Sequence, residues 1–351
     1  MTGKNNRYRI LWDIAYALYF ISFFVEDVAF TADSTQNMVM KLVRYGSYLI
    51  FVFLLFMRKN EAWYRIIICL IGIGLAVVCT LYTRDLYYET LLFIIFSSVV
   101  IDPKHFFKLS YWLLLSLTGV VIVGSFVGLI PMVNTPRTID GASRLAYGFY
   151  HSDVLPLVLF YLIVYRIMMD YQHLKLRRVF LWLALDVIVY LLCDSRNGLV
   201  GVGILCAGCI CFCKFKRKRY RILVLAAKYL VIALSLFAIV GMLLQGRGGA
   251  LAEFMNSVMT KRLSIAYAQY LSMGLHLFNK MDWSTYAKYR YVLDNGYIFV
   301  AMRYGLAFLP FYWVVHFFAA RKNKYLPVVL VALTVVLVLY SVWLSVLHLS
   351  V

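Results

Sequence analysis

The sequence predicts an all-α, polytopic membrane protein with about eleven transmembrane helices and a helical extracytoplasmic loop, a GT-C-like architecture. Three observations lead there: 64% of the 351 residues are hydrophobic, the mean hydropathy is +0.81, and long apolar runs recur along the chain. Only 15% of the residues are charged, whereas a soluble domain is about a quarter charged. A soluble fold cannot hide this much apolar surface, because the buried share grows slowly with chain length. We therefore expect one integral membrane domain over residues 1–351.

The apolar runs are predicted to be spans because roughly 20 mostly apolar residues cross about 30 Å of hydrocarbon. The N-terminal run follows basic residues as in a signal peptide, but it is long and contains Asp13, Glu26 and Asp27. We therefore expect it to be retained as the first span. The predicted spans are 10–30, 38–57, 64–82, 86–101, 109–130, 152–169, 179–194, 197–213, 222–243, 296–319 and 325–348.

Lysines and arginines gather on one set of connections between these spans, most densely over 214–221. Because the side richer in these residues faces the cytoplasm, we expect a plasma-membrane protein whose N-terminus is cytoplasmic. Insertion then explains most of the net charge of +19, and no nucleic-acid partner is required.

Two connections on the opposite side are long, an outer loop over 131–151 and a large outer loop over 244–294. The large loop carries net positive charge that topology does not need, which indicates an anionic ligand on the extracytoplasmic face. Apolar residues recur at helical spacing over 249–278, as in short amphipathic helices that lie on the membrane face. These apolar residues are Leu251, Phe254, Val258, Leu263, Ala266 and Tyr270.

The outer segments contain the candidate catalytic and substrate-binding residues. These are four arginines and one histidine: Arg137, Arg144, Arg196, Arg262 and His151. Guanidinium groups bind phosphate oxygens in a fork geometry and stay charged, so this set suits a lipid-linked diphosphate and a hydroxyl nucleophile.

Each of these residues also has a plain structural reading. Arg196 could cap a span or bind lipid headgroups, and Arg262 could be a solvated loop charge. His151 could be a satisfied histidine at a helix start, with His276 as its competitor for a catalytic role. Asp294 could simply cap the start of a helix, where a carboxylate is stabilised by free N–H groups.

We expect no cofactor and no metal site. Cys206, Cys209, Cys211 and Cys213 lie in an apolar segment, where free cysteine acts as a small hydrophobe. The sequence has no glycine-rich phosphate loop, and its outer segments have no paired aspartates to hold a divalent cation. Asp186 is the main ionisable residue within a predicted span.

Four short elements occur in order along the predicted outer segments: Gly148–Asp153, Ser195–Leu199, Thr260–Leu263 and Asp294–Tyr297 with Tyr304–Gly305. Together they resemble the Wzy-type polysaccharide polymerases, the O-antigen and capsule polymerases of the O-antigen ligase superfamily. That family often has Gly-Phe-x-His-Pro-Asn before a span, then Ser-Arg-Thr/Gly-Gly, Ser-Gly-Arg-Leu, and Asp-Asn-x-Tyr followed by Tyr-Gly. The chain departs from this pattern at Ser152, Asp153 and Lys261.

The resemblance implies a membrane glycosyltransferase that polymerises undecaprenyl-diphosphate-linked oligosaccharide repeat units into capsule, exopolysaccharide or O-antigen. Arg196 and Arg262 would stabilise the leaving diphosphate with support from Arg144, and His151 would accept the proton of the acceptor hydroxyl. It also suggests a flippase and a chain-length regulator as partners, besides membrane lipids. Substrate binding would fall to four further residues of the outer segments, Arg137, Asp294, Asn295 and Tyr297.

Two alternatives remain. An O-antigen-ligase-like enzyme would share the donor site and pass the glycan to another acceptor. A flippase or transporter of lipid-linked sugars would need polar residues through the middle of the membrane, usually with repeat symmetry, and Asp186 is nearly alone there.

Overall fold

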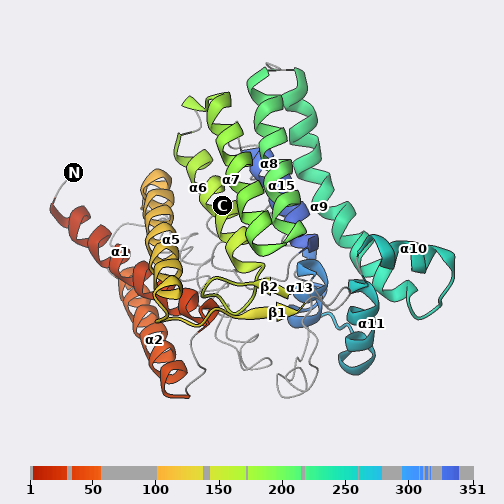
Figure 1. Cartoon of the computed structure of the whole chain (residues 1–351), viewed down its shortest axis with the longest axis horizontal. Coiled ribbons are helices and arrows are strands. Elements are labelled where there is room, and N and C mark those ends of the chain that lie inside the picture. Colours follow the sequence, from red (N-terminus) through yellow and green to blue (C-terminus); the bar gives the residue numbers. More distant parts are fainter. Residues whose placement is uncertain are drawn as a thin grey trace.

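The computed structural model shows a mostly helical protein (Figure 1). It describes residues 3–29, 34–56, 101–136, 143–170, 173–214, 218–259, 261–278, 295–307, 309–310, 313–314, 317 and 326–339. The helices are α1 (Gly3–Phe24), α2 (Ser34–Phe56), α5 (Pro103–Phe126), α6 (Val154–Asp170), α7 (Leu176–Cys193), α8 (Arg196–Lys214), α9 (Lys218–Leu244), α10 (Ala250–Val258), α11 (Arg262–Met273), α13 (Gly296–Tyr304) and α15 (Leu326–Leu339).

The helices α1, α2 and α5 pack together through aromatic side chains. Trp12 and Tyr16 stack at 5.1 Å within α1, and the Tyr16 hydroxyl lies 2.8 Å from Ser110 Oγ in α5. Asp102 caps α5 by accepting from the Lys104 N–H at 3.1 Å. These contacts fix the position of α5, which packs against α6.

The helix α6 is the centre of the main hydrophobic core. It is buried along most of its length and packs against α5, α7 and α8, while α15 packs against α8 and α9. Close packing between α6 and α8 depends on Gly198, because a Cβ there would collide with Pro156. The start of α8 is therefore held against the start of α6.

A second, smaller core joins α9, α10, α11 and α13. Gln245, just past α9, donates from Nε2 to the carbonyls of Gly241 and Ala252, at 3.1 and 3.0 Å. This amide ties the end of α9 to α10. Two short helices, α10 and α11, thus lie within the connection over residues 244–294.

Within the described residues, three helical segments are long and apolar enough to cross a membrane, namely Arg7–Asp27, Pro103–Phe126 and Arg221–Leu244. The helix α6 has 17 residues, and α7 contains three charged residues within its 18. The outward face of α7 is nonetheless apolar, with Leu181, Leu185, Ile188 and Leu192 exposed. Soluble monomers rarely expose such continuous apolar surface, so the structure supports a helical membrane protein.

The structure corrects one predicted span and leaves others untested. The apolar run 296–319 is not one helix, because α13 ends at Tyr304 and Gly305 takes φ +97°. The N–H groups of Leu306 and Ala307 instead donate to the carbonyls of His276 and Leu277, at 3.0 and 3.1 Å. Span 64–82, and span 86–101 up to residue 100, lie outside the described residues, and the count of eleven spans stays a prediction.

The outer loop over 131–151 contains a small antiparallel sheet that the sequence analysis did not predict. Strand β1 (Asn134–Pro136) pairs with β2 (Ser143–Leu145), and Thr135 lies opposite Arg144. The sheet lies at the end of the bundle where α7 ends (Figure 1).

Candidate functional site

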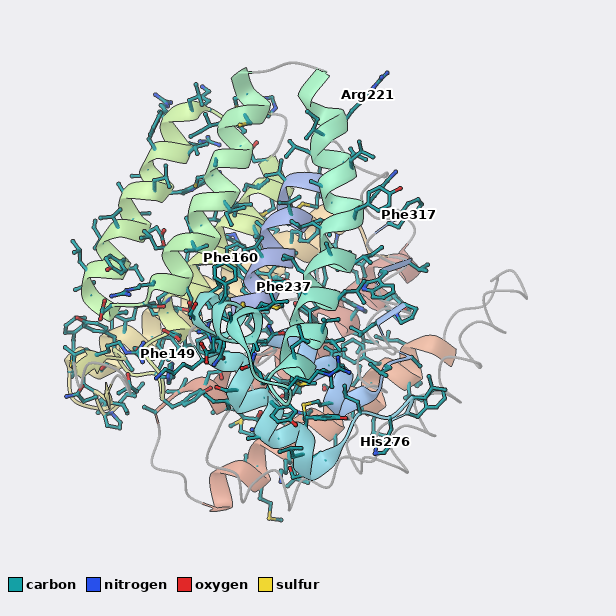
Figure 2. The ribbon with its side chains drawn as sticks, turned by 90° about the vertical axis from the view of Figure 1, so that its right-hand side faces the viewer. Phe149, Phe160, Arg221, Phe237, His276 and Phe317 are labelled. Atoms are coloured by element: carbon teal, nitrogen blue, oxygen red, sulfur yellow. The ribbon has the colours of Figure 1, made fainter. Side chains whose placement is uncertain are left out.

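The segments that carry the predicted site residues share one end of the molecule. The sheet, the starts of α6 and α8, and the helices α10, α11 and α13 lie toward the bottom of Figure 1. Arg221, near the start of α9, lies at the opposite end from Phe149 and His276 (Figure 2). The elements that carry these residues therefore lie together at one end of the helical bundle.

The segment before α6 is held by the junction between α1 and α2. The N–H of Ala29 donates to the Gly148 carbonyl at 2.8 Å, and the N–H of Tyr150 donates to the Asp27 carbonyl at 3.1 Å. Phe149 is fully buried. Gly148 has φ +85°, and a Cβ there would lie 3.0 Å from the Val121 carbonyl oxygen, so only glycine fits without strain. This support fixes the backbone that leads to His151.

Arg144, His151 and Asp153 form a cluster of charged and polar groups. Arg144 Nη1 lies 3.5 Å from Asp153 Oδ1, and His151 Nδ1 lies 3.8 Å from Asp153 Oδ2. The Arg144 and Asp153 side chains are mostly buried, whereas the His151 side chain is 40% exposed. Within the described part of the chain, Arg144 Nε, Ser152 Oγ and Asp153 Oδ1 are buried without a hydrogen-bond partner. Such groups are costly unless something satisfies them, which makes this cluster a candidate for binding a polar ligand.

A hydrogen bond indicates which nitrogen of the neutral His151 ring carries the proton. The backbone N–H of Asp153 donates to His151 Nδ1 at 3.2 Å. A nitrogen that accepts a hydrogen bond carries no proton, so the neutral ring holds its proton on Nε2. In this arrangement His151 offers a donor, and not an acceptor, at Nε2.

The end of α7 lies beside the same cluster. It packs against β2, the strand that carries Arg144, and burial raises the pKa of the neighbouring Tyr147 above its ordinary value. After Cys193 the chain reverses at Asp194, which has φ +47° and donates from its N–H to the Tyr190 carbonyl at 2.7 Å. Two residues later Arg196 opens α8 with an exposed side chain. The packing of Gly198 on Pro156 brings this helix start to the start of α6.

Arg262 opens α11, in the second set of helices. Lys261, directly before it, has φ +63°. Asn256 holds the turn, since its carbonyl accepts from the Lys261 N–H at 2.8 Å and its Oδ1 accepts from the Ser264 N–H at 3.1 Å. The helix α11 packs against α9, α10 and α13. Arg262 is thus at the same end as the cluster but on a different group of helices.

The remaining predicted residues divide into two kinds. Asn295 Oδ1 accepts from the N–H groups of Tyr297 and Ile298, at 3.0 and 3.1 Å, and the Tyr297 side chain is buried. These contacts give Asn295 a role as helix cap and Tyr297 a role in the core, and contact with substrate stays a prediction. Arg137 and Asp294 lie outside the described residues.

Asp153 is a member of the site that was not predicted from the sequence, where it stands out only as a departure from the family pattern. An acidic residue two positions after a histidine was the available signal, because such spacing allows the two side chains to meet.

No family model, curated protein or solved structure matches the chain. Among the described residues, no group of three or more His, Cys, Asp or Glu side chains could hold a metal ion.

Proposed function

We propose that the protein is a membrane glycosyltransferase that polymerises lipid-diphosphate-linked oligosaccharide repeat units on the extracytoplasmic face. The observation that carries the proposal is the cluster of Arg144, His151 and Asp153 beside the helix start that bears Arg196, at one end of an apolar helical bundle. A membrane-embedded enzyme for a lipid-linked substrate needs its polar site at such an edge, where the lipid tail can remain in the bilayer.

The proposed reaction is a displacement at the anomeric carbon of the growing glycan. A hydroxyl of the incoming repeat unit forms the new glycosidic bond, and the bond to the lipid diphosphate breaks with its electron pair on the diphosphate. Arg196 and Arg262, supported by Arg144, stabilise the developing negative charge, because fixed cations lower the energy of a transition state in which such charge forms. Direct displacement inverts the anomeric configuration.

The exposure of Arg196 supports this role for it. Its side chain is exposed at the first turn of α8, and helix N-termini favour anions. A guanidinium there can meet a diphosphate at the membrane surface without first breaking a buried contact.

The backbone at Lys261 supports the resemblance on which the proposal rests. The family pattern has glycine at this position, and here the residue has φ +63°, a conformation that glycine adopts most readily. The turn that presents Arg262 therefore has the backbone shape that the family pattern favours, although lysine occupies it.

The test is elongation by the purified protein in vesicles that contain two differently labelled lipid-linked repeat units. A polymerase makes chains in which both labels occur together and which stay attached to lipid. A ligase-like enzyme would lengthen nothing until a separate acceptor is added, and a flippase would move units across the bilayer without joining them. Either of those results would contradict the proposal.

A further inference from the structure

We infer that His151 acts as a hydrogen-bond donor through Nε2, and that the carboxylate of Asp153 accepts the proton of the attacking hydroxyl. This replaces the proton-accepting role that the sequence resemblance implied for His151 and assigns that role to Asp153, and it rests on the proposed function.

The first step concerns the imidazole. Nδ1 of His151 accepts the Asp153 N–H at 3.2 Å, so the neutral ring has its proton on Nε2. To accept a second proton, the ring would have to take it on Nδ1, toward the N–H that it now binds, and this would break that hydrogen bond. The exposed part of the ring can instead donate from Nε2 to an oxygen of the bound diphosphate or sugar.

The second step concerns the carboxylate. Asp153 Oδ1 is buried without a hydrogen-bond donor among the described residues, and it lies 3.5 Å from the Arg144 guanidinium. The guanidinium at this distance orients the carboxylate. Inverting glycosyl transfer elsewhere uses a carboxylate as general base, and its transition state resembles an oxocarbenium ion. A weak base suffices when the bond to the leaving group is largely broken before the proton is lost.

The reaction balances with these roles. The acceptor oxygen bonds to the anomeric carbon, its proton passes to the Asp153 carboxylate, and the anomeric carbon–oxygen bond to the diphosphate breaks with the electron pair on the diphosphate. His151 Nε2 donates a hydrogen bond and Arg144 holds Asp153 in place. The proton then leaves Asp153 to water, which restores the carboxylate.

The experiment compares His151→Gln, His151→Ala and Asp153→Asn in the purified elongation assay. Glutamine keeps a donor near the position of the imidazole Nε2 but cannot accept a proton. We expect His151→Gln to lose no more than about tenfold in rate, whereas His151→Ala loses about 100-fold, the cost of a lost transition-state donor. Asp153→Asn should lose about 100-fold or more, as on removal of a general base, and its residual rate should rise with pH because hydroxide replaces the carboxylate.

His173, exposed on the connection after α6 at the other end of that helix, provides the matched control, and His173→Ala should elongate like the wild type. Thermal unfolding of each variant separates lost fold from lost chemistry. If Asp153→Asn unfolds, Asp153→Glu, which keeps a carboxylate, should retain more activity than Asp153→Ala.

Two results would overturn the inference. His151→Gln as inactive as His151→Ala would make His151 the proton acceptor, and an active Asp153→Asn would remove the carboxylate from the chemistry. Failure of the wild type to elongate at all would instead refute the proposed function.

Discussion

Asp153 illustrates how one carboxylate can organise several groups. It lies within 4 Å of both Arg144 and His151, and its own backbone N–H fixes the His151 ring. The sequence places these residues on one side of the membrane, but it does not reveal which atoms meet. That depends on the turn at Gly148 and on the buried Phe149, whose positions are set by the distant residues Asp27 and Ala29.

A second carboxylate, that of Asp170, lies at the opposite end of α6, and its ion pairs predict how the stability of the fold depends on pH. Its Oδ2 accepts from Arg178 Nη1 at 2.6 Å and lies 3.6 Å from Arg166 Nη2. The Arg178 hydrogen bond lowers the pKa of Asp170 below its ordinary value, although burial opposes this. A carboxyl whose folded-state pKa is lowered stabilises the fold above its unfolded pKa, and that stability is lost as pH falls through the folded pKa.

We therefore expect Asp170→Asn to reduce the free energy of unfolding at pH 7 by about 0.2–1 kcal/mol, the range for an ion pair with partly exposed side chains. The difference from wild type should shrink as pH falls below about 4. Denaturant unfolding in detergent from pH 7 to pH 3 measures it. A difference that stays constant over this range would show that the ion pair is not its source.

At the scale of elements, the close approach of α8 to α6 is the contact that brings Arg196 toward the cluster. A Cβ at Gly198 would collide with Pro156, whereas nothing lies within 4 Å of a Cβ at Gly203 in the same helix. We expect Gly198→Ala to destabilise the protein by about 1–3 kcal/mol through overpacking. Gly203→Ala should be neutral or stabilise it by up to about 1 kcal/mol, since alanine favours helix. Thermal unfolding of both variants measures the difference. An equal change in melting temperature for Gly198→Ala and Gly203→Ala would mean that α6 and α8 do not meet at Gly198.

The turn between α10 and α11 gives a second prediction at this scale. Lys261 has φ +63°, which costs a residue with a Cβ roughly 1–2 kcal/mol. Glycine relieves that strain but loses more chain entropy on folding. We expect Lys261→Gly to raise the melting temperature slightly and Lys261→Val to lower it, because a β-branched residue fits this conformation worst. A valine variant as stable as the glycine variant would contradict the observed turn.

Helices were more predictable than the breaks between them. The length of the continuous apolar runs locates α5, α6, α7 and α9, since such runs are the sequence signal of membrane spans. Two features escaped prediction. Strands of three residues, such as β1 and β2, are too short to show alternation. The break at Gly305 is hidden because apolar residues continue on both sides, and its cause is pairing with residues 276 and 277.

At the scale of the whole molecule, the orientation in the membrane decides whether the site can meet lipid-linked substrates. The charge pattern predicts that Glu253, exposed on α10, lies outside and that His173 lies in the cytoplasm. An epitope tag inserted beside each residue tests this by protease digestion of sealed vesicles. In right-side-out vesicles we expect loss of the tag near Glu253 and protection of the tag near His173. Inside-out vesicles should give the opposite pattern, and a reversed result would place the site in the cytoplasm.

The central claim is that arginines at this end of the bundle stabilise a lipid diphosphate during polymerisation. Its most direct test is the length of the glycan that the purified protein makes in vesicles when Arg196 and Arg262 are both changed to alanine. Insertion and thermal unfolding are checked alongside, and Arg221→Ala at the opposite end is the control. We predict long, lipid-attached chains from the wild type and the control, and single repeat units from the double variant. Chains of normal length from a stably folded double variant would contradict the claim.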